Sequence, residues 1–148
     1  MLQRLTASAA AVAWLATASP VSADDIADGV ATMPGAVEDV RIGGTWDRGS
    51  SSGLYRIVVT RSGGNTITAR LFVQWVAFDD DGGSTLIDSI EIEEVGELGI
   101  DVIDYISDSD GDGLSVFIQA DNPAEPDVDS FELFVFSTSS YMFDVATN

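Results

Sequence analysis

Apolar and polar residues alternate along short segments over most of the chain, which is the pattern of β-strands with one buried face. The clearest case is residues 67–77, where every second position is apolar and Thr68, Arg70 and Gln74 lie between. Further segments of this kind lie at about residues 40–46, 85–93, 100–106, 114–120, 131–137 and 141–145. Turn-forming residues separate them at roughly 8 to 16 residues, as in an all-β sandwich or barrel. We therefore predict an all-β fold: a single antiparallel domain of about seven or eight strands, a meander-type sandwich or barrel.

The segment before residue 67 carries a matching apolar set and predicts a β-hairpin. For the two sets to share one face, Tyr55 should lie opposite Val73, and Val59 opposite Ala69. This register leaves a loop of Gly63-Gly64-Asn65, where glycine suits the left-handed conformation that a three-residue hairpin loop requires.

Residues 1–23 have the features of a secretory signal peptide. Arg4 is the only charged residue, an apolar run follows at 9–18, and Val21-Ser22-Ala23 has the form of a cleavage site. The apolar run is shorter than the roughly 20 residues that cross a bilayer. We expect export to the periplasm or beyond the cell, with no membrane insertion after cleavage. Residues 24–38 are acidic and contain glycine and proline, and we predict a flexible N-terminal arm there before an all-β domain at 39–148.

The composition removes many kinds of chemistry. The chain has no histidine, cysteine or lysine, so His-dependent triads, zinc sites that need imidazole, disulfides and lysine nucleophiles are excluded. Its 25 acidic residues all follow residue 23, the net charge is −19, and no basic residue follows Arg70. Nucleic acids and anionic lipid surfaces are therefore poor partners. A solvated surface, an attraction for cations and a basic partner protein remain as three explanations of this charge.

The segment "DSDGDGLSVFIQ", residues 108–119, resembles the start of a calcium-binding loop. Asp108, Asp110 and Asp112 occupy alternate ligand positions, a glycine follows, and the carbonyl of Leu114 would be a further ligand. Gln119 stands where an EF-hand has its bidentate glutamate, and strands flank the loop, so this is not an EF-hand. Two successive Asp-Gly pairs are also a strong hairpin signal. The candidates are thus a Ca²⁺ site at these four residues, or an acidic turn with no cofactor.

A meander would place alternate loops at one end of the domain. The loops at 47–53, 79–84 and 107–113 would then share an end, and six aspartates from the second and third would crowd it. Asp47 would lie near them.

Two stretches carry resemblances. "SGLYRIVVTRSGGNTITARLFVQW" resembles small uncharacterised secreted bacterial β-rich proteins, a resemblance that implies no particular function. "GGTWDRGSSSG", residues 43–53, resembles the Gly-x-Trp opening strand of lipocalin and avidin barrels, which implies a closed barrel with an internal ligand. Core packing is the alternative interpretation of that motif, with glycine making room for the indole ring.

These observations favour a non-enzymatic exported β-domain that acts as a binding or cell-envelope interaction module, with calcium as its candidate stabilising ion and an unknown protein or small molecule as its partner. The alternative is a small-molecule carrier with a closed lipocalin- or avidin-like barrel, lined by residues such as Trp46, Tyr55, Trp75 and Phe117. A hydrolase that uses two carboxylates is a third hypothesis. Its weakness is that the acidic residues cluster in turns.

Overall fold

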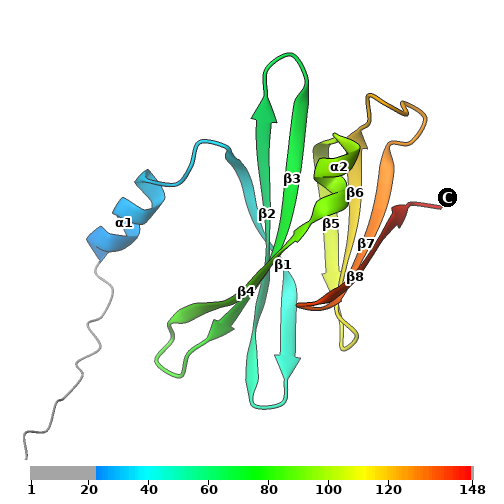
Figure 1. Ribbon diagram of the computed structural model, residues 1–148. Coiled ribbons are helices and arrows are strands. Elements are labelled where there is room, and N and C mark those ends of the chain that lie inside the picture. Colours follow the sequence, from blue (N-terminus) through cyan, green and yellow to red (C-terminus); the bar gives the residue numbers. More distant parts are fainter. Residues whose placement is uncertain (1–22, 148) are drawn as a thin grey trace, which may run out of the picture. The chain divides into compact units, whose positions relative to one another are not determined.

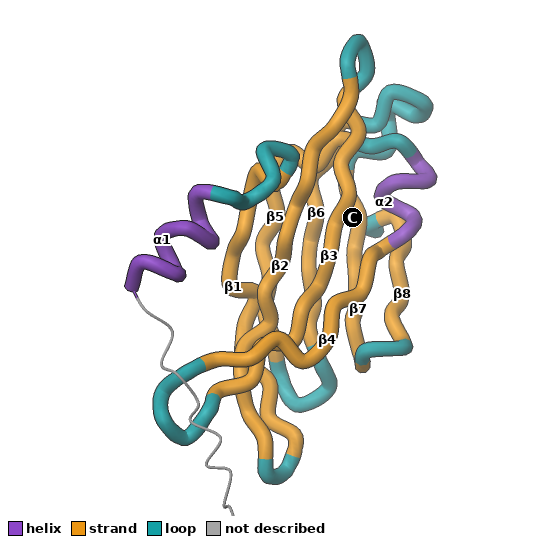
Figure 2. Tube along the Cα trace, turned by 60° about the vertical axis from the view of Figure 1, so that its left-hand side comes forward, coloured by secondary structure: helices purple, strands orange, loops and turns teal. Residues whose placement is uncertain are grey.

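The computed structural model describes residues 23–147, which contain two four-stranded antiparallel sheets (Figure 1 and Figure 2). The first sheet has the order β1 (Val37–Arg48), β2 (Ser51–Gly63), β3 (Ile67–Phe78) and β4 (Ser84–Ile92). The second has the order β5 (Asp101–Ser109), β6 (Leu114–Asp121), β7 (Ser130–Ser137) and β8 (Ser140–Val145). Each sheet is a meander of sequential neighbours. The predicted all-β fold is confirmed, as two sheets in a sandwich and not as a closed barrel.

One apolar core lies between the sheets. Every second residue of the central strands is buried. All strands except β8 contribute buried residues, and β4 contributes only its last residue, Ile92. The largest side chains that are almost fully buried are Trp75, Phe131, Ile57, Leu71, Ile92, Ile100, Leu114, Ile118 and Leu133. The inward faces that alternation predicts are therefore the faces that pack together.

The β2–β3 hairpin has a register two residues away from the predicted one. Tyr55 lies opposite Trp75, and Val59 lies opposite Leu71, so the loop begins after Gly63. A shift of two keeps every side chain on its predicted face, because side chains alternate with a period of two. The observed register places the Tyr55 and Trp75 rings edge to face, with centroids 5.7 Å apart.

Two short helices had no counterpart in the sequence prediction. Helix α2 (Glu93–Leu98) connects β4 to β5, buries Val95, and ends at Gly99, whose φ of 66° is left-handed. The Tyr141 hydroxyl of β8 donates a hydrogen bond of 2.8 Å to Glu94 in this helix. Helix α2, which directly follows β4 in the chain, is thereby linked to the edge strand β8.

Helix α1 (Ala23–Ala31) forms a compact unit of its own with the residues up to Met33. Aspartates in its first turn suit the positive end of the helix dipole. The arm predicted at 24–38 thus contains this helix and the first residues of β1. The predicted signal peptide lies outside the described residues except for Ala23.

Glycines in β1 and β2 allow close packing around the Gly-x-Trp motif. Trp46 lies opposite Gly53, and a Cβ added at Gly53 would come within 2.8 Å of the Trp46 ring. Gly44 has a φ of 146°, and a Cβ there would collide with the Ser109 side chain of β5. The glycine that makes room for the indole is therefore Gly53 across the hairpin, while Gly44 lets β1 approach the second sheet.

We expect Gly44→Ala to destabilise the domain by about 1–3 kcal/mol, because it adds a strained backbone conformation to a steric clash with Ser109. Gly111→Ala is the matched control, since a Cβ at Gly111 meets nothing within 4 Å. Urea unfolding of both variants measures the difference. Equal midpoints would contradict the close approach of β1 and β5 at this position.

Candidate functional site

The predicted calcium segment forms the β5–β6 hairpin turn. Asp110 accepts backbone hydrogen bonds at its Oδ1 from Asp112 (2.9 Å) and Gly113 (3.2 Å), and its own N–H donates to the Gly113 carbonyl. Asp108 accepts a hydrogen bond from its neighbour Ser109, and Leu114 is buried in the core. Within residues 23–147 no group of three or more acidic side chains is placed to hold a metal ion. The geometry supports the turn interpretation, and calcium binding stays a prediction.

The loops after β1, β3 and β5 lie at one end of the sandwich, as a meander requires (Figure 1). Asp47 and Asp110 line one surface groove there, together with Trp46 and Phe78. Asp79 instead closes its own loop, because its N–H donates to Gly83 and its Oδ2 accepts from Thr85. The shared end is therefore present, while the predicted crowd of six aspartates does not form a metal-holding group among the described residues.

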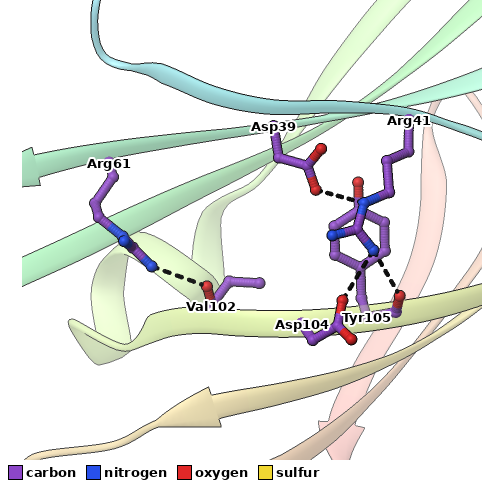
Figure 3. A network of polar contacts seen from close by, with 6 residues as sticks. All are labelled: Asp39, Arg41, Arg61, Val102, Asp104 and Tyr105. Carbon is purple, nitrogen blue, oxygen red and sulfur yellow. Dashed lines mark hydrogen bonds and ion pairs between the residues drawn. The ribbon is translucent and has the colours of Figure 1, made fainter.

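Two arginines of the first sheet reach across to β5, and we call these contacts the arginine seam (Figure 3). Arg41 donates to the Asp104 carboxylate at 2.8 Å and to the Tyr105 carbonyl at 3.3 Å. Arg61 donates to the Asp101 carboxylate at 2.8 Å and to the Val102 carbonyl. No ladder of backbone hydrogen bonds joins β1 to β5, so side chains make the polar contacts between these edges: the two arginines, and the Ser109 hydroxyl, which accepts from the Thr45 N–H at 2.9 Å.

The contacts of the arginine seam shift the pKa values of its members. The hydrogen bond from Arg41 lowers the pKa of Asp104, and the same bond raises the pKa of Arg41. The Arg41 guanidinium also lies 4.5 Å from the centroid of the Tyr105 ring, a cation–π contact. Burial raises the pKa of Tyr105, whose hydroxyl makes no hydrogen bond of normal geometry among the described residues. The seam lines a groove of about 440 Å³, but its arginines are already neutralised by Asp39, Glu38 and the β5 acids.

The residues predicted to line a barrel have other positions. Trp46, Tyr55 and Trp75 are packed into the core between the sheets. Phe117 points away from the core, on the outer face of β6, and is 39% exposed. The expectation of a closed lipocalin- or avidin-like barrel was wrong, because the chain forms two separate sheets whose inner faces pack on one another.

The outer face of the second sheet carries an apolar stripe that the sequence prediction overlooked. Ile106 lies directly opposite Phe117, and Phe134 lies directly opposite Met142. Phe117 and Phe134 are diagonal neighbours, since Phe134 pairs with Ser115. We call Ile106, Phe117, Phe134 and Met142 the apolar stripe; it crosses all four strands. Ile106 is 71% exposed and Met142 50%, on the side of a sandwich sheet that is ordinarily polar.

Carboxylates border the apolar stripe. Glu132 and Asp144 lie directly opposite each other on β7 and β8, beside Phe117 and Met142 in the register. Neither forms an ion pair among the described residues, and β5–β8 contain no basic residue. A signal for this face existed in "FELFVF", residues 131–136, where the apolar run is nearly continuous and thus indicates a strand with apolar side chains on both faces.

Comparison with protein-family models, with curated proteins and with solved structures finds no match for this chain. Among the described residues, neither helix is long and apolar enough to cross a membrane. The candidate functional site therefore follows from the geometry alone. Both sheets expose large apolar side chains, among them Ile42 (68%) on the first sheet and Ile106 (71%) on the second, and on the second sheet they stand beside carboxylates that have no cation within the described part of the chain.

We expect Asp110→Ala to lower the free energy of unfolding by about 0.5–1.5 kcal/mol, because two turn N–H groups lose their acceptor. Asp110→Asn keeps an oxygen at that place, and Asp112→Ala removes a side chain with no such contact, so both should melt close to wild type.

A calcium titration at matched high ionic strength tests whether the β5–β6 turn binds the metal. Bound calcium would stabilise wild type by roughly 2.7 kcal/mol at a hundredfold excess over the Kd, and the double variant Asp110→Asn with Asp112→Asn would not respond. If wild type and the double variant respond equally to calcium, the segment is a turn that binds no calcium.

We expect Asp104→Asn to be less stable than wild type at neutral pH, and the difference to vanish in acid. The folded pKa of Asp104 is lowered, so its contribution is complete above its ordinary pKa of about 4 and is lost as the pH falls through the folded value. Melting curves from pH 7 down to about pH 2 measure this. Asp108→Asn on the same strand is the control, because Asp108 has no ion pair. A difference that persists unchanged in acid would contradict the Arg41–Asp104 contact.

Proposed function

We propose that this protein is an exported, non-enzymatic β-domain that acts as a binding or cell-envelope interaction module. The observation that carries the proposal is the apolar stripe on the outer face of the second sheet. Exposed apolar surface costs solubility, and apolar side chains gathered on neighbouring strands of a sandwich typically mark a contact surface for another molecule.

The rest of the molecule fits this role. The signal peptide expected at residues 1–23 supports export. The composition leaves carboxylates as the only abundant titratable groups, and those with lowered pKa, Glu91 and Asp104, are paired with arginines. The outer face of the second sheet presents apolar side chains from all four strands, which suits a macromolecular partner.

We expect the Ile106→Ser and Met142→Ser double variant to lose partner retention in a pull-down from cell-envelope extract, by at least about tenfold. Each substitution removes exposed apolar surface from the stripe without touching the core. Retained proteins are quantified by mass spectrometry against wild type.

The control is Ile42→Ser with Ile87→Ser, which removes apolar side chains of similar exposure from the first sheet. Melting curves of all three proteins should coincide, because the four side chains are exposed. A wild-type protein that retains nothing above background, or retention that both double variants reduce equally, would refute the proposed function.

A further inference from the structure

We propose that the partner of the second sheet is a basic protein segment that places apolar side chains on the apolar stripe and its lysines or arginines on the bordering carboxylates. This inference rests on the proposed function, and it deepens that proposal by naming the chemistry of the partner. It also selects one of the three explanations for the extreme acidity of the chain.

The first argument is the unbalanced charge of Glu132 and Asp144. Like charges directly opposite on antiparallel strands repel each other and destabilise the sheet. On the outer face of the first sheet, by contrast, Glu91 of β4 has a cation beside it, Arg70 of β3. The second sheet has no cation to balance this pair. A cationic side chain from a partner would supply the missing charge.

The second argument is the interleaving of charge with apolar surface. Glu132 stands between Phe117 and Asp144 in one row of the sheet, and Phe134 and Met142 form the next row. Phe134 and Phe136 also line a groove of about 230 Å³ with Asp110 and Asp112 of the β5–β6 turn. An apolar side chain on the stripe would thus bring neighbouring residues of the same segment within reach of carboxylates on either side.

Other occupants fit less well. Two copies of this face would bring acidic residues together with no cation between them, and anionic lipid headgroups would be repelled. The outer face of the first sheet does carry arginines, but Arg70 is already paired with Glu91, and Arg56, held by Gln74, would offer a second copy one isolated cation against two carboxylates. A basic segment from another protein satisfies both the apolar and the charge requirement.

The test uses synthetic peptides of twelve residues on the whole mature protein: alternating Lys–Leu, alternating Lys–Ser and alternating Glu–Leu. Fluorescence anisotropy at 0.15 M salt gives each Kd. We expect Lys–Leu to bind at least about tenfold more tightly than Lys–Ser, and Glu–Leu not to bind. Equal affinity for Lys–Leu and Lys–Ser would overturn the inference, since attraction to the net charge alone would explain it.

Matched charge variants locate the binding surface. Glu132→Gln with Asp144→Asn removes two negative charges beside the stripe, and Asp80→Asn with Asp81→Asn removes two from a turn of the first sheet. We expect the first pair to weaken Lys–Leu binding about tenfold while raising the melting temperature, because the repulsion is relieved. The second pair should bind like wild type. Equal weakening by the two pairs would overturn the inference.

Failure of this inference differs from failure of the proposed function. A neutral or acidic protein that is captured from the envelope extract and lost with Ile106→Ser and Met142→Ser would keep the binding role and refute the basic partner. If sedimentation shows that the mature protein self-associates and that the same variant abolishes this, the binding role would be kept, and the partner would be a second copy of the chain and not a basic segment. Specific Lys–Leu binding on this face without any captured partner would support the chemistry and count against the envelope role.

Discussion

The open edge between β1 and β5 determines the architecture of this domain. The two meanders would close into a barrel only if β1 paired with β5 and β4 with β8, but Asp39 and Arg41 lie opposite the buried Val59 and Ile57 and so face the interior side of β1. Charged side chains there cannot enter an apolar core, so the edge stays hydrated and the backbones do not form a ladder. The same arginines then reach β5 through their side chains, at the carboxylate of Asp104 and at backbone carbonyls. Burial of the apolar faces brings the sheets together, and the arginine seam sets how their edges meet.

The strands could be predicted because alternation is strong along the sequence, whereas their exact pairing could not. In the β2–β3 hairpin, a translation by two residues leaves the apolar face unchanged, and the glycines at 63 and 64 permit either loop. Side-chain contacts between the two strands distinguish the observed register: the Tyr55 ring meets the Trp75 ring, and Arg56 donates a 2.7 Å hydrogen bond to Gln74. Helix α2 was missed because six residues are too few for a helical period to emerge, and its single buried residue, Val95, is defined by the sheets around it.

The candidate site was predicted only in part, for a related reason. The Asp-Gly pairs indicated a hairpin turn at 108–113, and the structure has one. The sequence alone could not decide whether the aspartates converge on a metal ion or whether Asp110 accepts hydrogen bonds within its own turn. The apolar stripe was overlooked because alternation was used to assign one face of each strand to the core. Phe117 stands at an outward position of that alternation, although it was named among the barrel-lining candidates, and its exposure acquires meaning only when Ile106 and Phe134 are found beside it on neighbouring strands.

The three explanations of the acidity can now be compared against one surface. A solvated face accounts for carboxylates, but it does not account for Ile106 at 71% exposure among them. Attraction of metal ions would require acids that converge, yet Glu132 and Asp144 stand with aromatic and aliphatic neighbours and without a third carboxylate placed to complete a site in the described chain. Contact with a macromolecule of opposite charge requires both features at once, apolar area for affinity and a charged border for orientation. The outer face of the second sheet differs from a simply solvated acidic surface because it has exposed apolar side chains and, within residues 23–147, unpaired carboxylates side by side.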